Sequence, residues 1–397
     1  MRILQLSNKA PYPPNDGSSI AIYNMANGFI QNNVELHLLS INTKKHYKAD
    51  NEIPASFKKS SNYLSIYRDT NISLLGLIFN LFSSASYFVS RFFFKEFEKA
   101  IETKLKENQF DIIQLEGIFL GNYLPIIRKY SKGKIILRAH NIEHLIWERL
   151  LENEKNFFKK IYLKIQNQRL KKFEIDIFKS VDAIVTITPF DESFIRKIPV
   201  NTKTFVSATG IDLERYKIEK QNEIKGSVFH FGSMDWMPNL EAVNWFLEKI
   251  WEPNFIERKD LQLIFAGRFM PKQLKEKEGA NIKVLEDVKD NIEFYNNHEI
   301  MLVPLLSGSG MRIKIIEGMA MGKCIISTSI GAEGIPVSDK ENIILANTEE
   351  EMKMALNEVI NNPELRKTIG ANARKFIERE FDNKEKIKSL IEFYRNI

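Results

Sequence analysis

The sequence LLSGSGMRIKIIEGMAMG at residues 305–322 organises the rest of the chain. It follows a buried-strand pattern at residues 300–303, and it joins a glycine and serine loop to the start of an apolar helical segment. Backbone N–H groups at a helix start lack intrahelical partners and carry the positive end of the helix dipole, and glycines let an anion approach them closely. A strand, a glycine loop and a helix start in this order therefore favour an anion-binding site.

Three charged side chains on this segment narrow the choice of anion. Arg312 and Lys314 add positive charge at the helix start, and Glu317 lies on the same helical face three residues after Lys314. Because a carboxylate can accept hydrogen bonds from sugar hydroxyls, the three residues together suit a ribose-bearing diphosphate. The alternative is a plain turn followed by a solvated Lys–Glu pair, although charges on so apolar a helix are costly without partners.

Composition limits the class of protein. A length of 397 residues with 44% hydrophobic content predicts two globular domains of similar size. The one cysteine, Cys324, excludes an intramolecular disulfide and lies in an apolar run, where a buried strand is expected. The net charge of +6 fits an anionic partner, which could be a nucleotide sugar, a nucleic acid or an acidic lipid. Residues 1–6 look like a first strand rather than a signal peptide, so a cytoplasmic protein is expected.

Strand and helix patterns alternate along the chain and predict an α/β protein with parallel sheets. Ligands are then expected at the carboxyl ends of the strands. The polar stretch at residues 214–225 is the predicted linker between the domains. The expected strands lie at residues 1–6, 34–41, 111–116, 134–139, 183–187, 228–233, 261–267, 282–285, 300–303 and 325–328.

Two features of the first half of the chain fall at such strand ends. Gly17 lies in a turn-rich loop after the first strand, where it faces a ligand or forms a simple turn. His140 and Asn141 follow the strand at residues 134–139, where they could hydrogen-bond to sugar hydroxyls or to a leaving phosphate. The alternative is that Asn141 caps a helix and His140 is an ordinary loop residue.

Two further segments raise the question of a membrane. Residues 70–90 carry no charge, and their small or polar residues recur every three or four positions, which favours one or two amphipathic helices packed in the core over contact with a lipid surface or a spanning helix. Residues 155–172 contain seven basic residues and no acidic one, interleaved with apolar residues. That pattern is typical of a helix lying on anionic lipid, and equally of a solvated surface helix.

The segment at residues 305–322 resembles the loop and helix of retaining glycosyltransferases of the family 4 type, in the form G-S-G-x-R-x-K-x-x-E-x-x-A-x-G. In the commoner family pattern two glutamates are separated by seven residues, and here the second matches Glu317 while the first falls on Ser309. This departure removes a carboxylate expected near the donor sugar. Many family members also place an Arg and a Lys in the loop after residues 228–231, where this chain has Ser233 and Asn239.

The resemblance implies a GT-B fold, in which two Rossmann-like, doubly wound parallel-sheet domains face a cleft. Residues 1–207 would bind the acceptor, residues 208–382 would bind the nucleotide-sugar donor, and a C-terminal helix at residues 383–397 would cross back to the first domain. The catalytic residues implied by the matching motifs are His140, Arg312 and Lys314. The implied donor-binding residues are Gly17, Gly232, Ser233, Arg268, Val288, Ser309, Gly310, Met311 and Glu317.

The function implied is the transfer of a hexosyl group from a nucleoside-diphosphate sugar to a glycan, polysaccharide or lipid-linked acceptor, with retention of configuration. The chain has no Asp-x-Asp motif, so neither a metal nor another cofactor is expected, and cationic side chains must stabilise the leaving diphosphate. A nucleotide-sugar epimerase on the same fold and a non-catalytic nucleotide-sugar-binding subunit are the alternatives. The expected setting is polysaccharide biosynthesis at the cell envelope, with an anionic membrane surface as a further partner and no nucleic acid.

Overall fold

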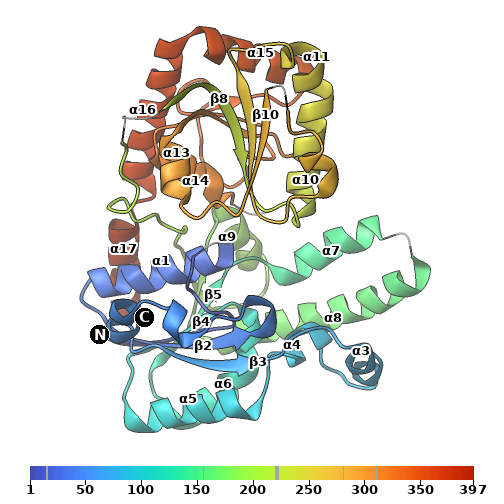
Figure 1. Cartoon of the computed structure of the whole chain (residues 1–397). Coiled ribbons are helices and arrows are strands. Elements are labelled where there is room, and N and C mark those ends of the chain that lie inside the picture. The colour runs from blue at the N-terminus through green and yellow to red at the C-terminus, as the bar shows by residue number, and fades with distance from the viewer. Residues whose placement is uncertain (15–16, 155, 220–222, 280, 309–310) are drawn as a thin grey trace. The chain divides into compact units, whose positions relative to one another are not determined.

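Two parallel sheets dominate the computed structural model, which describes residues 1–14, 17–154, 156–219, 223–279, 281–308 and 311–397 (Figure 1). The first structural unit comprises Met1–Gly210 and Asn383–Ile397, and the second comprises Ile211–Asp382. The chain therefore leaves the first unit at Gly210 and returns to it at Asn383. The described part of the predicted linker, residues 214–225, belongs to the second unit, so that prediction is wrong.

The described residues of the first unit form a seven-stranded parallel sheet in the order β3-β2-β1-β4-β5-β6-β7. Its strands are β1 Arg2–Ser7, β2 Glu35–Thr43, β3 Leu64–Arg68, β4 Ile112–Glu116, β5 Lys134–Ala139, β6 Ala183–Thr186 and β7 Lys203–Val206. Its helices are α1 Gly17–Gln31, α2 Ala55–Ser60, α3 Leu74–Leu81, α4 Tyr87–Ser90, α5 Lys95–Glu107, α6 Leu124–Tyr130, α7 Glu143–Asn153, α8 Phe157–Ser180, α9 Pro189–Arg196 and α17 Asn383–Arg395.

The described residues of the second unit form a six-stranded parallel sheet in the order β10-β9-β8-β11-β12-β13. Its strands are β8 Ile224–Phe231, β9 Gln262–Gly267, β10 Ile282–Glu286, β11 His298–Val303, β12 Cys324–Ser327 and β13 Ile344–Leu345. Its helices are α10 Met237–Phe246, α11 Glu252–Phe255, α12 Lys272–Lys275, α13 Asn291–Asn296, α14 Ile313–Ala320, α15 Glu349–Asn361 and α16 Pro363–Glu380. Cys324 is buried in β12, as the sequence predicted.

Both faces of the first sheet are buried, which explains why apolar residues occur at successive positions in its strands, as at Ile112–Ile113 and Ile135–Leu137. Neighbouring residues on a strand point to opposite faces, so Leu4 belongs to one apolar cluster and Ile3 to another. The second of these clusters includes Leu390 and Tyr394 of α17. The predicted return of the C-terminal helix to the first unit is confirmed by this packing.

Each sheet reverses its strand order at one place, between β1 and β4 in the first unit and between β8 and β11 in the second. At such a reversal the following loops run to opposite sides of the sheet and leave a crevice at the carboxyl ends of the strands. In the second unit this is the end at which Phe231 and Val303 lie. The described residues 305–308, which follow β11, and helix α14 lie beyond that edge in the sequence.

The uncharged segment at residues 70–90 forms two short helices, α3 and α4. Core packing is confirmed for α4, whose Phe88 and Val89 are buried. It is wrong for α3, which exposes Ile78 and Phe79 and is followed by an exposed Phe82. Among the described residues, no helix has the length and apolar character that crossing a bilayer requires.

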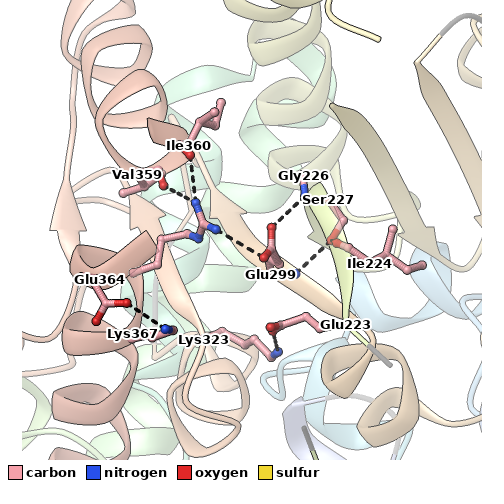
Figure 2. A network of polar contacts seen from close by, with 11 residues as sticks. Glu223, Ile224, Gly226, Ser227, Glu299, Lys323, Val359, Ile360, Glu364 and Lys367 are labelled. Atoms are coloured by element: carbon pink, nitrogen blue, oxygen red, sulfur yellow. Dashed lines mark hydrogen bonds and ion pairs between the residues drawn. The ribbon is translucent and has the colours of Figure 1, made fainter. Parts of the chain in front are cut away.

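A polar network lies at the opposite, amino-terminal end of β8 and β11 (Figure 2). Glu299 accepts a hydrogen bond from the backbone N–H of Gly226 at 2.7 Å and from Arg366 of α16 at 3.3 Å, and Arg366 also donates to the carbonyl of Ile360 at 3.0 Å. Lys323, also buried, pairs with Glu223 at 2.8 Å. This network ties α16 to the sheet, and it lies away from the carboxyl ends where ligands are expected.

Candidate functional site

Lys314 lies in the first turn of α14, and its side chain reaches back to the loop that follows β8. Its ammonium donates to Asn239 Oδ1 at 2.8 Å and lies 3.3 Å from His230 Nε2. Burial, reinforced by the positive charge of Arg312, lowers the pKa of Lys314 to about 7. The amine therefore exchanges its proton near neutral pH, and an anion bound beside it would favour the charged form.

Gly232 provides the room for this lysine. A Cβ atom at Gly232 would lie 2.6 Å from Lys314 Nζ, and one at Gly267 would lie 1.8 Å from the carbonyl oxygen of Gly232. Two glycines thus let β8, β9 and the lysine approach one another at the strand ends. Asn239 completes the loop by donating from Nδ2 to the carbonyl of Ser233 at 2.8 Å.

Arg312 occupies the N-cap position of α14, makes no side-chain capping hydrogen bond, and is buried. Its guanidinium carbon lies 5.3 Å from the centre of the Trp236 ring, a cation–π contact between the two loops that flank the strand reversal. Burial lowers the pKa of Arg312 as well, but an arginine stays protonated at any physiological pH. Two basic residues are therefore present where the sequence predicted positive charge.

Glu317 is buried one turn further along α14. Its Oε1 accepts hydrogen bonds from Tyr216 Oη at 2.6 Å and from Asn291 Nδ2 at 3.0 Å. Burial raises the pKa of Glu317, although the hydrogen bond from Tyr216 opposes the rise. Both of these bonds end on Oε1, and Tyr295 also lowers the pKa of Glu317, so a ligand hydroxyl would share the carboxylate with these three side chains.

The remaining predicted donor-binding residues lie around the same strand ends. Ser233 donates to Asp235 at 2.6 Å, Arg268 directly follows β9, and Val288 lies in the turn between β10 and α13. Met311 directly precedes Arg312 and is half-buried. The predictions for Ser309 and Gly310 fall outside the described residues. The structure brings Lys314 against Gly232.

In the first unit, His140 follows β5 and its Nε2 lies 2.6 Å from Glu116 Oε2. Glu116 is only 1% exposed at the end of β4, and it also accepts from Gln5 at 2.7 Å and from Arg138 at 3.2 Å. Burial by itself raises the pKa of Glu116, but Arg138 and His140 outweigh it and hold the pKa at about 2. The carboxylate is therefore ionised and can only accept, so His140 donates to it from Nε2.

Two smaller predictions in the first unit have different outcomes. Gly17 is exposed at the start of α1, where a Cβ atom would meet nothing within 4 Å, so no close approach requires glycine there. Its role in binding stays a prediction. Asn141 does not cap a helix, because the residue that precedes α7 is Ile142.

Sequence reasoning missed the partners of the predicted residues. His230, Tyr216 and Asn291 in the second unit, and Glu116 in the first, were not proposed as site residues. A usable signal existed for His230, because a histidine inside the apolar strand β8 needs a polar partner. Tyr216 gave no such signal, since it lies in the stretch interpreted as a linker. Among the described residues, no group of three or more His, Cys, Asp or Glu side chains could hold a metal ion.

The sequence is similar to those of known proteins. Residues 225–362 match the family model described as Glycosyl transferases group 1. The chain is 25% identical over 98% of its length to a protein in the cps region of Klebsiella pneumoniae, 98% of which is covered. It is 23% identical over 72% of its length to an uncharacterized glycosyltransferase of Methanocaldococcus jannaschii, of which 76% is covered.

Solved structures share the fold at low identity. Sucrose-phosphate synthase from Thermosynechococcus elongatus superposes with a TM-score of 0.71 at 15% identity, over 100% of this chain and 99% of that one. HepE of Anabaena, solved with UDP-glucose, superposes with a TM-score of 0.64 at 14% identity over 100% of both chains. Together with the two parallel sheets, these matches show that the chain has the GT-B fold.

Proposed function

We propose that the protein is a retaining, metal-independent glycosyltransferase that transfers a hexosyl group from a nucleoside-diphosphate sugar to a glycan, polysaccharide or lipid-linked acceptor. The observation that carries the proposal is the position of Lys314, a half-buried amine held at the strand reversal of the second sheet in the first turn of a helix. That is where an α/β sheet of this order accepts a diphosphate. Envelope polysaccharide assembly is the setting we propose, with the Klebsiella pneumoniae relative from the cps region as support.

The chemistry follows from the charges. As the bond between the anomeric carbon and the diphosphate breaks, negative charge grows on the leaving oxygen, and the cations of Lys314 and Arg312 stabilise it. The acceptor hydroxyl attacks the same face of the sugar, and its proton passes to an oxygen of the leaving diphosphate. In the first unit, His140 is the residue that we propose for a hydrogen bond to a sugar hydroxyl. The products are the glycoside and a nucleoside diphosphate.

The direct test is a thermal-shift screen with UDP, GDP, ADP and dTDP, followed by incubation with the matching nucleotide sugar. UDP comes first, because HepE was solved with UDP and with UDP-glucose. A ligand at a hundred times its Kd stabilises a protein by about 2.7 kcal/mol, which is readily seen as a higher melting temperature. Transfer that requires an acceptor and continues in EDTA would support the proposal. Release of a free sugar without an acceptor would favour an epimerase, and the absence of any turnover would favour a binding subunit.

We predict that Glu317→Gln weakens nucleotide binding while leaving the fold intact. The amide oxygen can replace Oε1 and keep the hydrogen bonds from Tyr216 and Asn291, whereas the amide nitrogen replaces Oε2 with a donor. Loss of hydrogen bonds to a charged acceptor should weaken binding by roughly tenfold or more. Calorimetry with UDP measures this, and Tyr216→Phe is the control that disturbs Oε1 alone. Equal affinities of Glu317→Gln and the unaltered protein would assign Glu317 a structural role.

A membrane surface is the further partner that we propose, at helices α3 and α8. Phe79 and Phe82 at the end of α3 are 72% and 89% exposed, and Phe157 and Phe158 at the start of α8 are 69% and 81% exposed. The two helices are joined by hydrogen bonds from Gln166 to Asn80 at 2.8 Å and from Arg169 to Leu81 at 3.1 Å. Large exposed aromatic residues on joined helices mark a surface that binds a partner.

Charge favours anionic lipid as that partner. Lys159, Lys160 and Lys164 are exposed on α8, and residues 70–90 carry no acidic side chain that would repel a headgroup. Each engaged lysine contributes roughly 1 kcal/mol near an anionic surface, and salt weakens the attraction. The apolar side chains would then enter the interface while the lysines contact phosphate.

We predict that the protein co-sediments with vesicles containing phosphatidylglycerol and that salt reduces this binding. Changing Lys159, Lys160 and Lys164 together to Gln should reduce it several-fold, and changing Phe79 and Phe82 to Ser should do the same at low salt. The matched control removes the same charge from the second unit, where Lys272, Lys275 and Lys277 are exposed. Binding that ignores both salt and the α8 substitutions would rule out the electrostatic mechanism.

A further inference from the structure

His230 is a buried histidine that takes no part in the proposed transfer reaction. It lies near the end of β8, is 1% exposed, and has its Nδ1 3.0 Å from the carbonyl oxygen of Leu302 on β11. A carbonyl oxygen only accepts, so Nδ1 carries the proton and donates. Nε2 is then a lone pair that faces Lys314 Nζ at 3.3 Å. The strand pair β8–β11 thus fixes both the tautomer and the orientation of the ring.

We propose that His230 is a positioning residue for Lys314, an acceptor that holds the ammonium in place to receive the donor's diphosphate and that controls how readily this amine gains its proton. The inference rests on the proposed function for its ligand, but it concerns a contact within the second unit alone. Nε2 of His230 and Oδ1 of Asn239 direct two of the three N–H bonds of Lys314. The third remains for an oxygen of the diphosphate.

The neighbouring charges support a role for His230 as a hydrogen-bond acceptor rather than as a proton donor. Burial, together with the charge of Lys314, holds the pKa of His230 well below its usual value, which favours the neutral ring. Around Lys314, Arg312 disfavours the ammonium and Glu317 favours it, while Asn239 on α10 is uncharged. His230 is therefore the neutral acceptor on β8 that stabilises the charged form of the amine.

His230→Leu removes this acceptor, and His230→Gln can replace Nε2 with an amide oxygen. In His230→Leu the ammonium loses a hydrogen bond, so the pKa of Lys314 should fall by about one unit and the basic limb of kcat/KM against pH should move to lower pH. We also expect turnover to fall about tenfold. His230→Gln should restore the position of the basic limb. His298→Leu is the matched control, because His298 is buried in the same unit and its Nδ1 faces a backbone carbonyl 2.6 Å away.

The deciding measurement does not need activity. Competitive acylation read by mass spectrometry gives the fraction of Lys314 that is deprotonated at each pH. The midpoint should fall in His230→Leu, and it should stay unchanged in His298→Leu. An unchanged midpoint in His230→Leu would overturn the inference. Calorimetry with UDP at pH 8 in two buffers adds a second readout, the number of protons taken up on binding. That number should be larger in His230→Leu, because a larger fraction of Lys314 is deprotonated before the diphosphate binds.

These outcomes separate the inference from the proposed function. If UDP and the other nucleoside diphosphates fail to bind, the proposed function fails, while the acylation midpoints still decide whether His230 controls Lys314. If UDP binds with equal proton uptake in the unaltered protein and in folded His230→Leu, the inference fails and the proposed function stands. Melting temperatures of the three variants confirm that each comparison is made on folded protein.

Discussion

Replacing Lys314 with alanine is expected to reduce kcat/KM for glycosyl transfer by about a hundredfold or more. The ammonium lies where charge grows on the leaving diphosphate, and loss of such a preorganised cation removes roughly 3 to 4 kcal/mol of transition-state stabilisation. The free energy of unfolding should change little. Alanine favours a helix, and removing the lysine also removes the free-energy cost of desolvating its ammonium. Steady-state kinetics with a UDP-sugar, beside a melting curve, measures both effects.

The matched control for this variant is Lys323→Ala. Lys323 is also buried in the second unit, but it pairs with Glu223 in the network at the amino-terminal end of the sheet (Figure 2). Its loss should lower the melting temperature and leave kcat/KM unchanged per folded molecule. If Lys314→Ala turns over at the rate of the unaltered protein, Lys314 does not neutralise the diphosphate.

Glu116→Ala is expected to destabilise the first unit by roughly 3 to 5 kcal/mol. The substitution leaves the fully buried guanidinium of Arg138 without its carboxylate, and an uncompensated buried charge is among the most destabilising changes a protein can suffer. Hydrogen exchange of the β4 and β5 peptides measures this effect within the first unit. The double variant Glu116→Ala with Arg138→Met should recover part of the lost stability, because it removes the unpaired charge.

A pH dependence follows from the same carboxylate. The folded pKa of Glu116, about 2, lies below the value of about 4.3 for an unfolded glutamate. Its contribution to stability is therefore present above pH 4.3 and is lost as the pH falls toward 2.

Glu299→Ala is the control for Glu116→Ala, because it removes a carboxylate paired with arginine from the second unit. It should weaken protection there and leave the β4 and β5 peptides protected. Equal protection of those peptides in Glu116→Ala would contradict the prediction.

The sequence predicted the parts of this structure that depend on local pattern. Apolar runs without charges became buried strands, and the glycine loop before an apolar helix led to Lys314 and Glu317. The strand end at Ala139 likewise identified His140. In each case the signal is a short run of residues whose chemistry is decided by neighbours in the chain, so it can be read without knowing the fold.

What the sequence did not predict depends on residues far apart in the chain. The partner of Lys314 is 84 positions away at His230, and that of Glu317 is 101 positions away at Tyr216. Strand order decides such pairings, and periodicity says nothing about strand order. The exposure of Phe79 was not predicted for a related reason. An apolar helical pattern predicts a core helix, and whether another element covers it depends on the fold.

The position of α17 has a consequence for synthesis on the ribosome. Tyr394 donates to Gln114 of β4, and Asn383 donates from its side chain to the carbonyl of Asn24 on α1 at 2.7 Å. The first unit therefore lacks part of its core until residues 383–397 have been translated, whereas Ile211–Asp382 is continuous and already complete. Because domains fold as units when their residues become available, we expect the second unit to be native first, although it is made second.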